Sequence, residues 1–267
     1  MKIKRNKNLT AGAVITAFML IIILVGLVWT PYDPNAMDAS AKMAGPSLAH
    51  LLGTDNFGRD ILSRVIQGAG ATFLIAAATV AIGLVAGLLI GGLTGYYGGW
   101  VDEVIMRLND AITAFPSILL ALVLIALLGS GKYNVILALG VLFVPSFARI
   151  VRTEVARQKS LDYVRSARLM GAGDMRILFL HIMPNILPVM LSTVAIGFNN
   201  AVLAEASMSY LGVGVQPPDA SLGRMLNEAQ GYLLTAPWYA LAAGVAIILL
   251  VLGFGLISEG LGGKYGA

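Results

Sequence analysis

The sequence predicts an all-α membrane protein whose chain crosses the bilayer six times. Of its 267 residues, 58% are hydrophobic and only 12% are charged, and the mean hydropathy is +0.83. Soluble domains carry about 25% charged residues, so little of this chain can form a soluble domain. The apolar residues are grouped in long runs, and about 20 apolar residues in a helix suffice to cross the hydrocarbon core.

The first expected span is the apolar run at residues 11–29. Four basic residues precede it: Lys2, Lys4, Arg5 and Lys7. The run is longer than the apolar part of a secretory signal, about 7–15 residues, and the nearest small-x-small cleavage site, at 39–41, lies far beyond it. We therefore expect a cytoplasmic N-terminus at 1–10 and a single transmembrane domain at 11–267.

The polar segment at 31–68 contains one more acid than base. Because cytoplasmic loops usually carry an excess of Lys and Arg, we expect this segment to be an external loop. Within it, 53–55 and 56–58 are typical of consecutive turns, and Asp60 is placed to start a helix. The segment either forms an ordered external loop or contacts a substrate directly, and the first alternative is favoured.

The remaining spans are expected at five apolar segments: 69–92, 114–128, 133–148, 186–204 and 238–257. In the second span, glycine recurs every four residues from Gly83 to Gly95, which predicts a close helix contact. Pro145 should break the fourth span, and Pro184 and Pro188 should kink the start of the fifth.

The segment between the second and third spans is the weakest part of this topology. Residues 96–116 carry three acids and one base, although the alternation of spans places them in the cytoplasm. Acids contribute little to orientation, so the topology is retained. Asp110 either lines a pathway through the membrane or is a helix-end acid that reaches water.

The basic loop, residues 149–183, has a net charge of +4, equal to the formal net charge of the whole chain. It has seven basic and three acidic residues. Ser160 is predicted to cap a helix at 161–170 that has Asp162 in its first turn and ends at Gly171. Its apolar face comprises Tyr163, Val164, Ala167, Met170 and Gly171. Such a helix either docks into a groove of a partner or lies on anionic lipid headgroups.

The spacing of Ala167, Gly171 and Pro184 resembles the "EAA" loop of ABC-importer permeases. The chain departs from that pattern at four positions, which are Arg165, Ser166, His181 and Met183. Two further segments, HLLGTDNFGRDILSR at 50–64 and EASMSYLGVGVQPP at 205–218, resemble signatures of C-type permeases of dipeptide, oligopeptide and nickel importers.

The resemblance implies the type I ABC-importer permease fold, with both termini cytoplasmic, in a bacterial cell membrane. It also implies a second homologous permease, two ATP-binding cassette subunits and an extracytoplasmic substrate-binding protein. The basic loop would then provide the coupling helix that docks on the ATPase. The residues expected to couple the permease to the ATPase are Asp162, Tyr163, Arg165, Ser166, Ala167 and Gly171. The expected cargo is a di- or oligopeptide, with nickel or a metallophore as the alternative.

Three polar residues in or near the fifth span are candidates for a translocation pathway: Asn199, Asn200 and Glu205. Polar groups at membrane depth are costly and often functional. The alternative is that they bond neighbouring helices or the external loop expected at 205–237.

No catalytic chemistry is predicted. The two Gly-Lys pairs, at 131–132 and 263–264, do not belong to a phosphate-binding loop, so we expect partner ATPases to bind ATP and Mg²⁺. With two histidines and no cysteine, no closed metal site is expected. The positive charge fits cytoplasmic loops rather than nucleic-acid binding. A stand-alone channel or secondary transporter is the alternative class, but the internal repeats and mid-membrane ionisable groups typical of such carriers are not evident.

Overall fold

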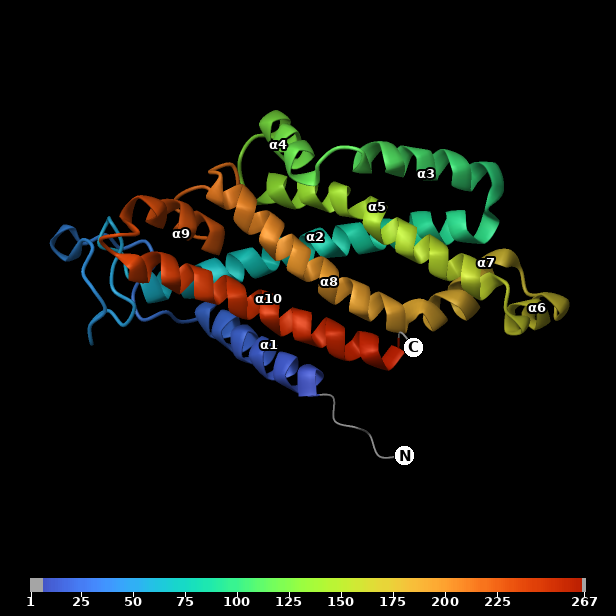
Figure 1. Cartoon of the computed structure of the whole chain (residues 1–267), viewed down its shortest axis with the longest axis horizontal. Helices are drawn as coiled ribbons and strands as arrows, with labels where there is room; N and C mark the ends of the chain where they lie inside the picture. The colour runs from blue at the N-terminus through green and yellow to red at the C-terminus, as the bar shows by residue number, and fades with distance from the viewer. Residues whose placement is uncertain (1–6, 266–267) are drawn as a thin grey trace.

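The computed structural model describes residues 7–265, and within that range all regular elements are helices. Five segments are long and apolar enough to cross a membrane. They are Lys7–Gly26 (α1), Ile61–Tyr97 (α2), Lys132–Lys159 (α5), Asp174–Tyr210 (α7 through α8) and Pro237–Gly262, the greater part of α10 (Pro237–Tyr265). They lie lengthwise in one elongated bundle (Figure 1). The predicted all-α membrane architecture is confirmed, while Lys2, Lys4 and Arg5 lie outside the described residues.

The predicted third span, 114–128, is not one straight helix. Gly99–Thr113 forms α3 and Ser117–Leu128 forms α4, and the two helices meet at an angle of 88°. With 12 residues, α4 is about 18 Å long, whereas the hydrocarbon core is about 30 Å thick. Pro116 accounts for the break, because proline lacks the N–H of a continuing helix and disfavours helical geometry at the preceding residue. The count of six spans holds only if this bent pair is one span.

Several helices extend beyond the apolar segments that predicted them. α2 covers Ile61–Tyr97 rather than 69–92, and α5 continues through Pro145 to Lys159 rather than ending near 148. Asp60 starts α2 as predicted, because its carboxylate accepts a hydrogen bond from the Ser63 N–H at 2.8 Å. A helix ends where its last backbone N–H and C=O groups bond to side chains, loops or water. The hydropathy of the sequence does not show where this happens.

Helices α2 and α5 pack closely along the predicted glycine stripe. A Cβ atom added to Gly87 would lie 2.5 Å from Phe147 Cβ, and one added to Gly91 would lie 2.3 Å from the Ala148 carbonyl oxygen. Larger residues at these positions would separate the two backbones. The close helix contact inferred from the four-residue period is confirmed.

The last turn before α8 (Met183–Tyr210) is unusual. Three residues, Asp174–Arg176, form α7, and Ile177–Ile182 form a π-helix that runs directly into α8. Pro184 is the second residue of α8 and directly follows the π-helix. Its missing N–H removes one backbone hydrogen bond at this junction. The π-helix is a rare form that occurs mostly as a single turn within longer helices, and here it connects the basic loop to α8 without an intervening coil.

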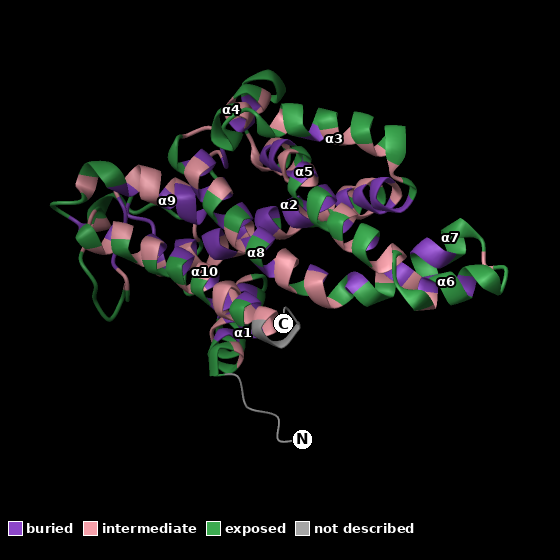
Figure 2. Ribbon diagram, turned by 45° about the vertical axis from the view of Figure 1, so that its right-hand side comes forward, coloured by how far each residue is buried: buried purple, intermediate pink, exposed green. Residues whose placement is uncertain are grey.

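The two ends of the bundle carry different structures. Helix α9 (Leu222–Ala229), the short 3-10 turn Gln230–Tyr232 and the segment at 27–60 cover one end, and α6 (Asp162–Leu169) lies at the other (Figure 1). These are called the α9 end and the α6 end below. The predicted turn at 56–58 is confirmed, because the Gly58 N–H donates to the Asp55 carbonyl oxygen at 3.0 Å and Gly58 has a φ of 77°. The turn predicted at 53–55 is wrong. The chain turns at 50–53 instead, where the Gly53 N–H donates to the His50 carbonyl oxygen at 2.9 Å, and Thr54 is extended in an isolated β-bridge with Asp60. Figure 2 shows exposed positions over most of α3, α4 and α6.

Candidate coupling loop and translocation cavity

The apolar face of α6 is buried inside the chain. Val164 and Ala167 are 2% and 3% exposed, and they pack with Ile177, Leu178 and Ile182 of the π-helix. Burying these side chains fixes α6 on the π-helix that leads into α8. A partner protein or a membrane surface can therefore contact only the opposite face of α6.

That opposite face is polar and open. The side chains of Asp162 and Arg165 are 94% and 71% exposed, and they form an ion pair at 3.3 Å. Of the six predicted coupling residues, Asp162, Arg165, Ser166 and Gly171 are exposed, Tyr163 is half-buried, and Ala167 is buried. The role of these residues in coupling stays a prediction. The four exposed residues are accessible to a partner protein, as that role requires.

The start of α6 differs from the prediction and its end agrees with it. Ser160 does not cap α6: it lies at the end of α5, and its hydroxyl donates to the Arg157 carbonyl oxygen at 2.8 Å. The N-cap position is occupied by Leu161, which makes no capping bond with its side chain. Because α5 extends to Lys159, Ser160 lies beside the last carbonyl groups of α5, which lack partners within the helix. The Ser160 hydroxyl bonds to one of these carbonyls instead of capping α6. Gly171 ends the helix with a φ of 84°, as predicted.

Tyr96, at the end of α2, anchors the basic loop. Its hydroxyl donates to Asp174 Oδ1 at 2.5 Å and accepts from Arg168 Nη2 at 3.1 Å, while Lys159 Nζ donates to its carbonyl oxygen. The hydrogen bond with Tyr96 raises the pKa of Arg168. The sequence analysis missed this anchor, because Tyr96 and Asp174 are 78 positions apart and neither belongs to a motif.

Two ion pairs join α3 to α5. Both Nε and Nη2 of Arg152 donate to Asp102, and Arg149 Nη2 donates to Asp110 Oδ1 at 2.8 Å. Asp110 is exposed beside Arg149 and does not line the cavity described next. Of the two alternatives for this residue, the geometry favours a helix-end acid that reaches water.

A cavity of ≈ 340 Å³ lies between α4, α5 and α8. Its polar lining consists of Ser117, Ser146, Thr193 and Asn200, and its other lining residues are uncharged. Of the three pathway candidates, the structure places Asn200 in this cavity. Their role in translocation stays a prediction.

Asn199 and Glu205 lie elsewhere. A Cβ atom on Gly255 of α10 would be 3.2 Å from Asn199 Nδ2, so this amide faces the contact between α8 and α10. Glu205 is fully buried near the α9 end, where the Ser209 hydroxyl donates to its Oε1 at 2.7 Å. Val215 N–H in turn donates to the Ser209 oxygen at 3.1 Å, so Glu205 belongs to a network that joins α8 to the segment after it.

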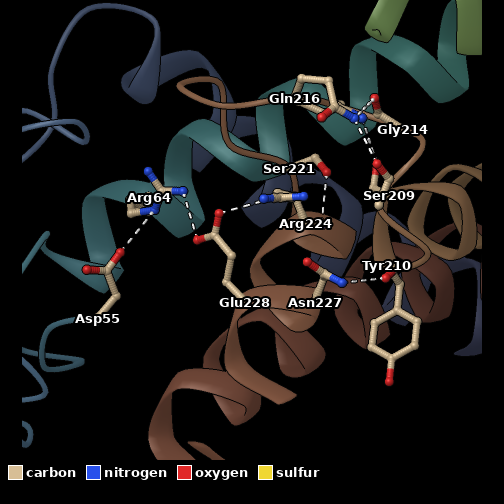
Figure 3. A network of polar contacts seen from close by, with 12 residues as sticks. Asp55, Arg64, Ser209, Tyr210, Gly214, Gln216, Ser221, Arg224, Asn227 and Glu228 are labelled. Carbon is tan, nitrogen blue, oxygen red and sulfur yellow. Dashed lines mark hydrogen bonds and ion pairs between the residues drawn. The ribbon is translucent and has the colours of Figure 1, made fainter. Parts of the chain in front are cut away.

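A second polar network holds α9 against α2 (Figure 3). Glu228 of α9 accepts hydrogen bonds from Arg59 (2.9 Å), Arg64 (3.4 Å), Arg224 (3.2 Å) and Tyr239 (2.9 Å). Burial alone would raise the pKa of Glu228, but the charge of Arg64, the Tyr239 hydroxyl, Arg59 and Arg224 together lower it below the usual value.

The segment at 50–64 is held by its own polar residues. Asp55 is fully buried and pairs with Arg59 at 2.6 Å, and Arg64 is 1% exposed. These side chains stabilise the α9 end and are closed to cargo. For this segment the geometry favours the ordered-loop alternative, and its position outside the membrane stays a prediction.

The spanning helices, the uncharged cavity among them and the basic loop at one end describe a multi-pass membrane protein. Residues 83–263 match the family described as "Binding-protein-dependent transport system inner membrane component". The match covers more than half of the 267 residues, and the chain belongs to this family. It is therefore an inner-membrane permease subunit of an ABC importer, as its sequence motifs predict.

Relatives of known role agree with this assignment. The chain is 41% identical to the glutathione transport system permease protein GsiD of Pectobacterium atrosepticum, over 91% of this chain and 82% of that protein. It is 38% identical to the dipeptide transport system permease protein DppC of Alkalihalophilus pseudofirmus, over 97% and 86%. A chain of the inward-facing MetNI methionine ABC transporter has the same fold, with a TM-score of 0.62 and 20% identity over 74% of this chain and 94% of that one.

Proposed function

We propose that this subunit forms half of a translocation pathway for di- or oligopeptides and is driven by ATPase subunits that dock on α6. The importer then contains a second permease, two ATPases that bind ATP and Mg²⁺, and an extracytoplasmic substrate-binding protein. The names of the relatives, which transport dipeptides and glutathione, support a peptide cargo. In this arrangement the α6 end faces the cytoplasm and the α9 end faces outward.

The observation that carries the coupling role is the attachment of α6. This helix is exposed on one face, is packed through Val164 and Ala167 on the π-helix that continues into α8, and is tied to α2 through Tyr96. A force applied to its exposed face therefore reaches two spanning helices directly. Helix α8 also lines the cavity, so a movement of α6 on ATP binding would change the cavity walls.

The first test is purification of the tagged chain from its native membrane, followed by identification of co-eluting proteins and by transport measurements. We expect two ATPases and a second permease, and ATP-dependent uptake of peptides after reconstitution with the binding protein. A chain that elutes alone and moves solute by itself would be an independent carrier. ATP-dependent uptake of nickel, or of a metallophore, in place of peptide would replace the proposed cargo.

The second test reverses one charge on α6. Arg165→Glu should abolish most ATP-dependent uptake while the complex still assembles, and Gly171→Pro should do the same by changing the end of α6. Arg107→Glu is the matched control, because Arg107 is similarly exposed and pairs only with Glu103 on α3 among the described residues. Normal uptake in both α6 variants would exclude α6 as the coupling helix.

A further inference from the structure

The cavity between α4, α5 and α8 is lined by one face of each of two spanning helices, α5 and α8. The lining positions of α8 include Thr193, Ile196, Gly197 and Asn200, which recur at three- and four-residue steps and so form one face of the helix. On α5, Ser146 occupies the corresponding face. Polar groups from two spanning helices thus converge on one space within the bundle.

The amide of Asn200 has no hydrogen-bond partner within residues 7–265, and the hydroxyl groups of Ser117 and Ser146 have none in the same part of the chain. The Thr193 hydroxyl donates to the Val189 carbonyl oxygen of its own helix at 3.0 Å. Asn200 is exposed in this chain, so its amide is free to bind a polar group that enters the cavity.

The lining also lacks every strong ligand for a metal ion. None of the 14 residues is Asp, Glu, His, Cys, Lys or Arg. A bare divalent cation prefers carboxylate, imidazole or thiolate ligands. An asparagine amide, in contrast, both donates and accepts, and so does the peptide group that it matches.

We propose that Asn200 is a specificity residue that contacts cargo in this cavity, where it pairs with backbone amides of a passing peptide. The uncharged walls let peptides pass whatever the charge of their side chains, and they do not conduct a bare divalent cation. This inference rests on the proposed peptide cargo. It deepens that proposal by assigning recognition to the peptide backbone rather than to side chains.

The test uses the intact importer, with its ATPases and binding protein, in proteoliposomes. Uptake is measured for dipeptides with an acidic, a neutral and a basic side chain, and each variant is compared with wild type for the same peptide. This ratio cancels the selectivity of the binding protein. Asn200→Asp should reduce uptake of the acidic peptide about tenfold relative to the basic one, because like charges repel inside the cavity.

Asn200→Ala should raise the KM for all three peptides by about three- to tenfold without changing their ratio, since it removes hydrogen bonds but adds no charge. Asn199→Ala is the matched control and should leave KM unchanged, because Asn199 faces α10. Ser146→Asp is a second charge variant in the same cavity. Ser146→Asp should also lower the uptake of the acidic peptide relative to the basic one. The test then still gives a result if one of the two Asp variants folds poorly.

The outcomes separate the two proposals. A wild-type complex that imports nickel ions alone and no peptide would overturn both the proposed cargo and the role of Asn200. A wild-type complex that imports peptide, with charge ratios unchanged in both Asp variants, would overturn only the role of Asn200. Loss of the second permease from the Asn200→Ala complex would also overturn it, because the residue would then be a subunit contact.

Discussion

Arg152 of α5 holds Asp102 of α3 through two hydrogen bonds, one from Nε and one from Nη2. Together with the pair between Arg149 and Asp110 at 2.8 Å, it places two acids of the segment at 96–116 against two bases of the basic loop. The segment had an excess of acids, which argued against its expected side of the membrane. In the folded chain these two acids are neutralised by arginines of the basic loop. The charge of each loop counted separately is therefore a poor guide to the side of the membrane on which the loop lies.

The first prediction concerns this pair. Asp102→Ala should lower the free energy of unfolding by about 1 kcal/mol, because a bidentate pair that is partly exposed is worth little more than a surface pair. The exchange Asp102→Arg with Arg152→Asp should restore part of the loss. Thermal unfolding of the purified complex measures both. Glu103→Ala is the control, since Glu103 pairs with Arg107 on the exposed side of α3, and a loss as large as that in Asp102→Ala would contradict the prediction.

The second prediction concerns Tyr96 and its neighbour. Tyr96→Phe removes the hydroxyl that joins α2 to Asp174 and Arg168, at a cost of about 1 kcal/mol. ATP-driven uptake should fall several-fold while the complex still assembles, because α6 loses one of its two attachments. Tyr97→Phe should have no effect, since the exposed Tyr97 hydroxyl makes no hydrogen bond within residues 7–265. Equal uptake by the two variants would show that the anchor does not transmit force.

Much of the fold was predictable from local signals in the sequence. Long apolar runs located the spanning helices, the recurrence of glycine located the contact between α2 and α5, and Asp60 and Gly171 marked helix ends. The helix lengths were not predictable in this way. The polar continuation of α5 to Lys159 depends on contacts with α2, and this continuation also moved Ser160 from the start of α6 to the end of α5.

The candidate site was predictable only in part. The sequence located three polar residues near the fifth span. Which of them faces the cavity depends on how α8 is rotated about its axis relative to its neighbours, and this rotation places Asn200, but not Asn199 or Glu205, in the cavity lining. The anchor between Tyr96 and Asp174 joins positions 78 apart. Contacts of this kind require the packed structure, because no local pattern connects the two segments.

The third prediction concerns the glycine stripe. Gly91→Ala would place a Cβ atom 2.3 Å from the Ala148 carbonyl oxygen, so the two backbones must move apart, at a cost of about 1–3 kcal/mol. Gly244→Ala in α10 is the matched control, because nothing within 4 Å would meet its Cβ. It should be neutral or slightly stabilising, since alanine favours helix. Thermal unfolding compares the two, and a Gly91→Ala protein as stable as the control would show that α2 and α5 can separate freely.

The last prediction concerns pH. The pKa of Glu228 is lowered in the folded protein: burial alone would raise it, but Arg64, Tyr239, Arg59 and Arg224 outweigh that effect. A carboxylate with a lowered folded pKa stabilises the fold above its unfolded pKa, and this contribution is lost as pH falls through the folded value. Because the ordinary value is 4.5, the loss begins below that pH.

Glu228→Gln should therefore lower the free energy of unfolding at pH 7 by about 3 kcal/mol, the usual cost of breaking a buried pair by removing one partner. Below pH 4.5 its stability should fall less steeply than that of wild type, because the titrating group is gone. Unfolding curves at pH 7, 5, 4 and 3 provide the measurement, with the exposed Glu103→Gln as control. Some slope remains in the variant, since hydrogen bonds from Ser40 also lower the pKa of Asp38. Parallel curves for Glu228→Gln and wild type across the acid range would mean that Glu228 is not the group whose charge holds α9 on α2.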